Sequence, residues 1–244
     1  MPAQPCVLCG GMSRAGLWCA ACDAALPYFD APHCPACALP TPTGEVCGHC
    51  LANPPLFTRT TAAFGYAFPL DKLIQAMKYG EQLALAHAFA NKLAQRVDKS
   101  ALPDFVMPMP LHSAKLRERG FNQSLLIAAV LARELNLTLL ANDCQRVRNT
   151  PPQSALPWQE RDKNVRNAFR CDVDLTGKRI VMVDDVMTTG ASLNALAEAL
   201  KRRGATEISA WVVARTLPRS ENRGQMTEDR GFVAAAPRFF NYAA

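Results

Sequence analysis

The sequence predicts an α/β fold, a mainly parallel sheet with helices on both faces, preceded by a small cysteine-rich module. Apolar, strand-like runs alternate with segments of helical periodicity between residues 59 and 214, which is typical of a sheet covered on both faces. Eight of the ten cysteines lie within the first fifty residues as Cys-x-x-Cys pairs. Hydrophobic residues make up 49% and charged residues 20% of the 244 residues, which excludes a disordered chain and permits a real core.

The cysteine-rich module is an internal repeat of a C-x2-C-x9-C-x2-C unit. A Cys-x-x-Cys turn directs two sulfurs at one centre, and two such turns complete a tetrahedral thiolate site for Zn²⁺. We predict two closed, structural zinc sites with the cysteines grouped within each repeat; grouping of the second pair with the third is the alternative. A thioredoxin-like redox site needs only one pair, so four repeated pairs do not fit it. The predicted zinc ligands are Cys6, Cys9, Cys19, Cys22, Cys34, Cys37, Cys47 and Cys50.

Charge is unevenly distributed along the chain. The net charge is +6, yet residues 1–57 contain a single basic residue, Arg14, and most of the excess positive charge lies in residues 112–170. The module and its thiolates are acidic, which favours a scaffold or protein-contact role over direct contact with DNA. Cys144 and Cys171 lie outside the repeat, and we expect both to be buried, inert thiols.

Targeting signals are not evident. The N-terminal residues lack the basic and apolar regions of a secretory signal, and no apolar stretch is long enough to span a bilayer. We therefore predict a cytoplasmic protein without membrane insertion. Residues 218–244 show little periodicity and are predicted to form a weakly ordered tail.

The predicted elements place polar residues where ligands bind in such folds. Ligands of open α/β sheets bind at the carboxyl ends of the strands, and the Pro-x-Pro turn at 108–110 and the pair Asp184 and Asp185 fall at two such ends. Residues 144–171 are rich in proline and are predicted to be mainly loop. The expected strands are 59–68, 104–110, 179–184 and 207–214, and the expected helices are 70–78, 82–97, 123–137 and 192–203.

The stretch VMVDDVMTTGAS, residues 181–192, combines two acids with an anion cradle. Its last five residues lie between a strand end and a helix start, where free backbone N–H groups, a glycine and hydroxyl side chains suit a phosphate. The Walker and G-x-G-x-x-G patterns are missing, which argues against a nucleoside triphosphate held by its γ-phosphate. If the phosphate is the 5′-phosphate of a ribose, Asp184 and Asp185 are positioned to accept hydrogen bonds from the sugar hydroxyls.

The same stretch resembles the phosphoribosyl-diphosphate (PRPP) motif of type I phosphoribosyltransferases. The chain as a whole resembles the ComF family of competence proteins, also labelled GntX-like. The matching stretches are MKYGEQLALA at 77–86, PMPLHSAKLRERGFNQS at 108–124 and the R-x-R-x-T-x-x-Q pattern that begins at Arg146. The resemblance covers residues 1–217 and implies a double zinc-ribbon module at 1–55, a type I phosphoribosyltransferase-like domain at 56–217 and the tail at 218–244.

The resemblance implies a site for PRPP with Mg²⁺. Asp184 and Asp185 are expected to hold the ribose and to favour an oxocarbenium-like transition state, which makes them the catalytic candidates. The backbone of Met109 and the basic side chains that follow it are assigned to the pyrophosphate. For Arg117 and Arg119, the alternative is an ordinary solvated turn. Lys78 either joins them or complements a helix dipole, and His112 is either structural or catalytic. The 5′-phosphate is assigned to Thr188, Thr189, Gly190, Ala191 and Ser192, and the pyrophosphate to Met109, Lys115, Arg117 and Arg119.

Three functions remain open from the sequence. The chain either transfers phosphoribosyl to an acceptor that residues 139–170 do not identify, or senses PRPP without turnover, or acts as an accessory protein in DNA uptake. The resemblance implies handling of single-stranded DNA together with DNA-uptake proteins in natural transformation. Arg146 and Arg148, with interleaved aromatic residues, are the DNA-binding candidates. The alternative is that these basic side chains surround the pyrophosphate. The aromatic residues are Phe121, Trp158 and Phe169.

Overall fold

The computed structural model describes residues 3–14, 16–80, 82–148 and 167–217 and separates the chain into two compact units. The first described unit, residues 3–26, contains an antiparallel pair, β1 (Gln4–Pro5) and β2 (Met12–Ser13), and one short helix, α1 (Ala20–Ala24). The second unit is residues 27–217. The predicted tail at 218–244 and part of the basic stretch, including Trp158, lie outside the described residues.

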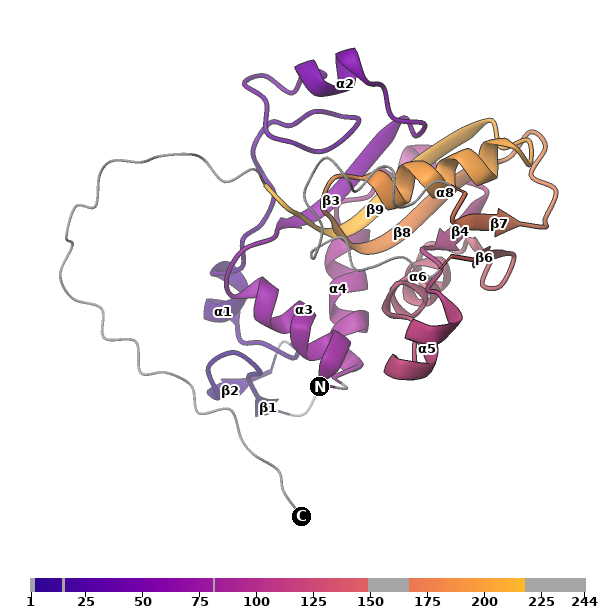
Figure 1. Ribbon diagram of the computed structural model, residues 1–244. Helices are drawn as coiled ribbons and strands as arrows, with labels where there is room; N and C mark the ends of the chain where they lie inside the picture. Colours follow the sequence, from indigo (N-terminus) through magenta and orange to yellow (C-terminus); the bar gives the residue numbers. More distant parts are fainter. Residues whose placement is uncertain (1–2, 15, 81, 149–166, 218–244) are drawn as a thin grey trace. The chain divides into compact units, whose positions relative to one another are not determined.

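A five-stranded sheet forms the centre of the second unit (Figure 1). Its strand order is β3-β9-β8-β4-β5, and every neighbouring pair is parallel, which confirms the predicted parallel sheet. Two further strands, β6 and β7, form a small antiparallel ribbon. The strands are β3 (Arg59–Gly65), β4 (Phe105–Pro108), β5 (Thr138–Leu139), β6 (Cys144–Arg146), β7 (Phe169–Cys171), β8 (Arg179–Met187) and β9 (Glu207–Arg215).

Helices cover both faces of this sheet. Helices α4 and α6 pack against one face, and α8 packs against the other (Figure 1). One helix was not predicted: residues 113–119, where a solvated turn was the alternative for Arg117 and Arg119, form helix α5, which begins after His112 and ends at Gly120. The helices are α2 (Gly48–Ala52), α3 (Leu70–Tyr79), α4 (Ala84–Ala94), η1 (Lys99–Ala101), α5 (Ser113–Arg119), α6 (Gln123–Glu134) and α8 (Ala191–Lys201). Among the described residues, no helix has the length and apolar character required to cross a membrane.

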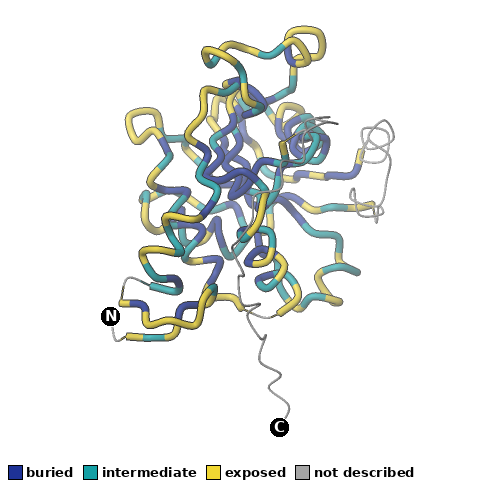
Figure 2. Tube along the Cα trace, turned by 90° about the vertical axis from the view of Figure 1, so that its left-hand side faces the viewer, coloured by how far each residue is buried: buried dark blue, intermediate teal, exposed yellow. Residues whose placement is uncertain are grey.

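The core lies along the two central strands, β8 and β9. Their middle residues are buried on both faces of the sheet, as the dark segments in Figure 2 show. Parallel strands covered on both faces lose the alternation of polar and apolar residues, which explains the continuous apolar run before Asp184. The two acids therefore follow directly on the buried, apolar part of β8.

The remaining cysteines are buried as predicted, but they are not free thiols. Cys144 of β6 lies directly opposite Cys171 of β7, and a disulfide joins them. The prediction of two inert, unpaired thiols is therefore wrong. The physical reason is the antiparallel pairing of β6 with β7, which places two residues 27 positions apart in the sequence side by side.

Candidate functional site

Two strand ends and the start of one helix build the candidate site. Asp184 and Asp185 lie in the last part of β8, which continues to Met187, and β4 ends beside them at Pro108. The chain then turns through residues 188–190 into α8. The carboxyl ends of neighbouring parallel strands meet at one edge of a sheet, so the structure brings the two acids and the 188–192 loop together where ligands of such folds bind.

Asp185 is a buried carboxylate with a cationic partner. Lys78, in the last turn of α3, makes an ion pair with it, and Gln123 Nε2 donates to Asp185 Oδ1 at 3.4 Å. Only 4% of Asp185 is exposed. Burial alone would raise the pKa of Asp185, but the charge and hydrogen bond of Lys78, together with hydrogen bonding to Asp184 and Gln123, hold that pKa below its usual range. The same ion pair raises the pKa of Lys78 although burial opposes it.

Asp184 behaves differently from its neighbour. Ser124 Oγ donates to Asp184 Oδ1 at 2.9 Å, and the backbone N–H of Asp185 donates to the same oxygen at 2.9 Å. Burial, followed by the charge of Asp185, raises the pKa of Asp184 to about 7, with Lys78 and Ser124 acting in the opposite direction. The acid pair therefore holds one proton more readily than two isolated carboxylates would, and near neutral pH it is poised to lose that proton when a cation or sugar hydroxyls arrive.

The loop after β8 has the geometry of an anion cradle. Gly190 has a left-handed backbone with φ of 85°, and a Cβ added there would lie 2.8 Å from Met187 Cε. Glycine is therefore the residue that fits this turn. Ala191 N–H donates to Thr189 Oγ1 at 3.2 Å, which orients that side chain at the start of α8. Helix α8 spans 11 residues, and its first turn presents backbone N–H groups and the positive end of the helix dipole to this loop.

Arg215, the last residue of β9, holds the start of the 188–192 loop by hydrogen bonds. The sequence did not point to this residue. It is only 2% exposed. Its guanidinium donates to the carbonyl oxygens of Met187 at 3.0 Å and of Thr216 at 2.9 Å, and also to that of Thr188. A charged residue at the end of a strand that is otherwise apolar was the only available signal, and it does not reveal these partners.

The predicted pyrophosphate residues do not all point to one place. Met109 is buried; its N–H donates to Val183 O at 2.8 Å, and its carbonyl accepts from Asn122 Nδ2 at 3.0 Å. Arg119 donates to Gln123, and its guanidinium lies 5.3 Å from the centre of the Tyr79 ring, so it reaches toward the acid pair. The remaining two lie on α5, where Lys115 faces Glu118 at 3.9 Å and Arg117 is exposed.

Local capping explains how α5 and α6 reach this position. His112 Nδ1 accepts from Ala114 N–H at 3.2 Å and begins α5, which Gly120 ends in a left-handed conformation. Asn122 Oδ1 then accepts from the N–H groups of Ser124 and Leu125 and begins α6. Two successive caps thus direct Gln123 and Ser124 from the first turn of α6 onto the two acids, and they give His112 a structural role.

The two DNA-binding candidates, Arg146 and Arg148, differ in how far they are buried. Arg146 of β6 is half-buried, its guanidinium lies 5.5 Å from the centre of the Phe169 ring, and its backbone bridges to His112. Burial lowers the pKa of Arg146, and the charge of Asp184 opposes this effect. Arg148 is exposed. The charge of Asp184 therefore acts on Arg146, whereas Arg148 lies on the surface.

The eight module cysteines form two groups, each within one repeat as predicted. In each group the four Sγ atoms lie within 4.8 Å of one another. The separation between Cys9 and Cys19 is 3.8 Å and that between Cys37 and Cys47 is 3.6 Å. A tetrahedron with Zn–S bonds of about 2.3 Å has sulfurs about 3.8 Å apart, so the donor set fits zinc. The groups, here named the first and second cluster, are Cys6, Cys9, Cys19 and Cys22, and Cys34, Cys37, Cys47 and Cys50.

The proton affinities of the thiols in the second cluster agree with a metal site. Burial opposes ionisation of Cys34, but backbone N–H donors lower its pKa to about 7. Burial and the neighbouring sulfurs raise the pKa of Cys50. Four adjacent thiolates repel one another unless a cation lies between them, so Zn²⁺ would supply the charge that lets all four ionise.

Comparison with known proteins finds family matches in both halves of the chain. The family described as double zinc ribbon domain matches residues 1–51, and the family described as phosphoribosyl transferase domain matches residues 122–233. DNA utilization protein YhgH of Escherichia coli strain K12 is 35% identical over 221 residues, which cover 87% of this chain and 97% of that protein. Competence protein F of Haemophilus influenzae is 32% identical over 223 residues, 86% of this chain and 96% of its own. A purine phosphoribosyltransferase from Pyrococcus horikoshii is 24% identical, covering 61% of this chain and 95% of its own, with a TM-score of 0.32.

Proposed function

Because the chain belongs to the family of DNA utilization protein YhgH and competence protein F, with a phosphoribosyl transferase domain behind a double zinc ribbon, we propose that it binds PRPP with Mg²⁺. The binding site is the acid pair together with the 188–192 loop, and the protein acts in the cytoplasm. A ribose phosphate is the ligand whose two ends match this arrangement, with hydroxyls for the carboxylates and a phosphate for the helix start.

The observation that carries this proposal is the placement of two neighbouring carboxylates beside an anion cradle. Carboxylates would repel a simple phosphate, so the site suits a ligand that presents neutral donors, or a cation, to the acids and its anion to the loop. Lys78 now neutralises Asp185. Lys78 lies close enough to the acids to turn toward the pyrophosphate of the ligand. Its ammonium group is a compact cation that binds phosphate well.

The chemistry that fits is transfer of the phosphoribosyl group. The bond between ribose C1 and the pyrophosphate oxygen breaks, its electron pair leaves with pyrophosphate, and the lone pair of a nucleophile forms the new bond to C1. Positive charge grows on the ribose in between, and the ionised Asp184 and Asp185 stabilise it. Mg²⁺, when bound with PRPP, would neutralise charge on the leaving pyrophosphate. Arg119 and Lys78 are the side chains that can add donors on that side.

Replacement of Asp185 by Asn tests the site. The change keeps the shape but removes the charge, and we expect calorimetry to show binding of Mg-PRPP weakened by about tenfold or more. Asp172→Asn is the matched control, since that carboxylate is exposed and pairs with Arg170 on the surface. Equal affinities of the wild type and Asp185→Asn for Mg-PRPP would contradict the proposal.

A screen for pyrophosphate release distinguishes transfer from sensing. The purified chain is incubated with Mg-PRPP and a nucleobase, ammonia or DNA as acceptor, and pyrophosphate is measured. Release that depends on one acceptor identifies a transferase. Binding of Mg-PRPP without release under any acceptor supports the alternative, a sensor of PRPP.

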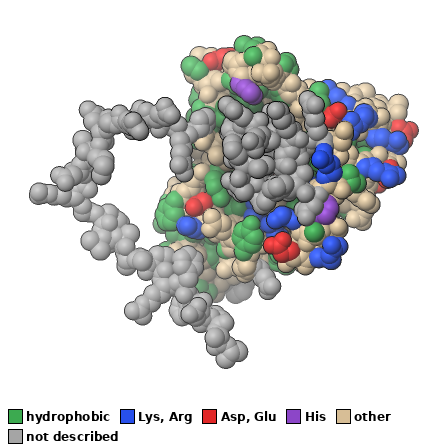
Figure 3. Space-filling model, in the orientation of Figure 1, with side chains coloured by type: hydrophobic (Ala, Val, Ile, Leu, Met, Phe, Trp, Pro, Cys, Tyr) green, Lys and Arg blue, Asp and Glu red, His purple; other side chains and the backbone are tan. Residues whose placement is uncertain are grey.

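Binding of single-stranded DNA is the second candidate function. The names of the two relatives refer to DNA utilization and competence, and Lys and Arg side chains gather on the face where β6, β7 and α5 lie (Figure 3). We expect the affinity to fall steeply as salt rises, and the double variant Arg146→Ala, Arg148→Ala to flatten this slope. The absence of any binding at low salt would contradict this function and leave the PRPP proposal intact.

A further inference from the structure

The second cluster is attached to the sheet that carries the candidate site. The Cys34–Cys37 turn packs on β3: Thr60 N–H donates to Pro35 O at 2.9 Å and Thr60 Oγ1 donates to Ala36 O at 2.6 Å. Thr60 Oγ1 also lies 4.0 Å from Met187 Sδ at the end of β8. The first cluster belongs to the other compact unit. The two repeats are thus alike in sequence, but the turn of the second repeat is hydrogen-bonded to β3 of the sheet.

Arg215 connects this turn to the loop after β8. Its Nε donates to Cys37 O at 2.7 Å, while its Nη1 donates to the carbonyls of Met187, Thr188 and Thr216. One buried guanidinium therefore bonds to a zinc-binding turn at one end and to the first residues of the phosphate cradle at the other. A guanidinium is rigid and planar, so displacement of either partner strains the bonds to the other.

The charge of Arg215 also depends on the second cluster. Among the described residues it makes no ion pair with a carboxylate. A buried guanidinium needs compensating negative charge, and four thiolates around one Zn²⁺ carry a net charge of −2 next to it. Loss of the metal releases the turn, because the cluster holds its shape through metal bonds.

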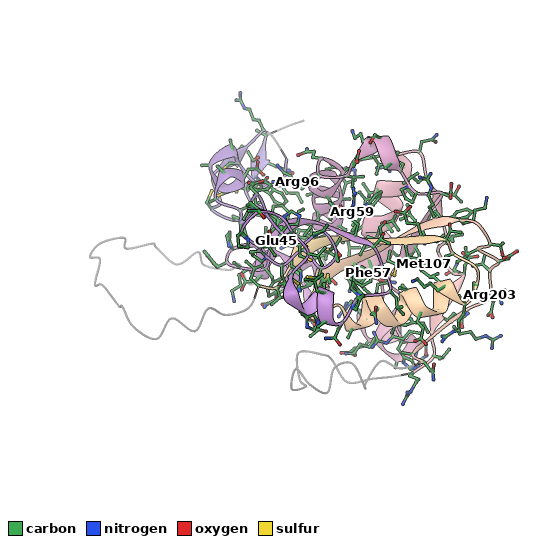
Figure 4. All side chains as sticks on the ribbon, turned by 90° about the horizontal axis from the view of Figure 1, so that it is seen from above. Glu45, Phe57, Arg59, Arg96, Met107 and Arg203 are labelled. Atoms are coloured by element: carbon green, nitrogen blue, oxygen red, sulfur yellow. A yellow bond between two sulfur atoms is a disulfide. The ribbon has the colours of Figure 1, made fainter. Side chains whose placement is uncertain are left out.

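A second contact joins the segment after the second cluster to the start of α8. The N–H of Leu56, in the segment that follows the second cluster, donates to Asn194 Oδ1 in the first turn of α8 at 2.7 Å. Phe57 lies in the interior (Figure 4), and its ring is 3.8 Å from the position that a Cβ on Gly190 would take. The second cluster and the residues after it therefore support both sides of the 188–192 loop.

We infer that Arg215 is a positioning residue through which zinc in the second cluster sets the shape of the 188–192 loop and its affinity for a 5′-phosphate. The part concerning affinity rests on the proposed function, whereas the part concerning the loop does not. The first cluster has no such role. The two zinc sites consequently differ in function: the second supports the ligand site, and the first leaves it unchanged.

Arg215→Lys tests the link without touching a metal ligand. Lysine keeps the charge but cannot reach Cys37 and the loop carbonyls together. We expect unchanged zinc content, faster hydrogen exchange at residues 187–192 by at least about tenfold, and affinity for ribose 5-phosphate and Mg-PRPP reduced by about tenfold, since a charge-assisted bond is lost. Arg203→Lys is the matched control, because Arg203 also donates to backbone carbonyls but lies at the periphery, beyond the end of α8 (Figure 4).

Serine variants of the two clusters test the role of the metal. We expect Cys47→Ser to lose one zinc and to reproduce the exchange of Arg215→Lys, and Cys19→Ser to lose one zinc while residues 187–192 stay protected. Equal protection of these residues in Arg215→Lys and the wild type, at equal zinc content, would overturn the inference even if Cys47→Ser unfolds. If the wild type binds neither ligand, the proposed function fails, and hydrogen exchange still decides whether the second cluster supports the loop.

Discussion

Replacement of Lys78 by Met removes the cation that faces the two acids and leaves Asp185 buried without its ion-pair partner. Removal of one partner from a buried ion pair costs about 3–5 kcal/mol in unfolding free energy. The Lys78 side chain is 20% exposed and Asp185 keeps its bond from Gln123, so we expect the lower end, about 3 kcal/mol, at pH 8. Urea unfolding of the zinc-loaded chain, monitored by circular dichroism, measures the loss.

The pH dependence distinguishes this cause from lost packing. Asp185 has a lowered pKa in the folded wild type, so its contribution to stability is present above its unfolded pKa and disappears as pH falls through the folded one. In Lys78→Met this pKa rises, and the acid pair takes up protons that neutralise it. The difference between variant and wild type should therefore be largest near pH 8 and shrink toward pH 5.

Lys72→Met alters the same helix, where an exposed lysine lies 4.0 Å from Asp71, and should change the unfolding free energy by less than about 1 kcal/mol at every pH. A loss in Lys78→Met that is the same at pH 5 and pH 8 would refute the view that Lys78 acts by compensating the acids.

Three other predictions concern the loop, the pyrophosphate side and the acid pair. Gly190→Ala should weaken binding of ribose 5-phosphate in calorimetry by about tenfold, because an added Cβ meets Met187, whereas Gly177→Ala, with open space around it, should show only backbone strain of about 1–2 kcal/mol in unfolding. Arg119→Ala should weaken PRPP by about tenfold but leave ribose 5-phosphate unaffected; an equal loss for both ligands would contradict its assignment to pyrophosphate. Since burial and Asp185 raise the pKa of Asp184 to about 7, affinity for Mg-PRPP should increase from pH 6 to pH 8, and a flat profile would exclude ionised Asp184 as a ligand group.

Local patterns allowed much of the fold to be predicted. The apolar run of β8 and the helical spacing of α6 and α8 are properties of short segments, because burial on one or both faces dictates which residues are apolar. The repeat spacing likewise predicted which cysteines group together, since a Cys-x-x-Cys turn places two sulfurs at one centre.

The features that were missed depend on contacts between distant segments. Arg215 donates to Cys37, 178 residues earlier, and no local pattern announces such a bond. Cys144 and Cys171 are joined only because β6 pairs with β7. Helix α5 has no buried residue and begins with a His cap, so it lacks the apolar stripe on which helix prediction depends. The ion pair of Lys78 with Asp185 was likewise absent from the predictions, which considered only pyrophosphate or the helix dipole for that lysine.

The most direct test of the central claim is calorimetric titration of the zinc-loaded wild-type chain with PRPP in the presence and absence of Mg²⁺. We expect one site per chain, stronger with Mg²⁺, that is competed by ribose 5-phosphate and lost in Asp185→Asn. Failure of the wild type to bind PRPP with Mg²⁺, or binding that ribose 5-phosphate does not displace, would contradict the assignment of the acid pair and the 188–192 loop to a ribose phosphate.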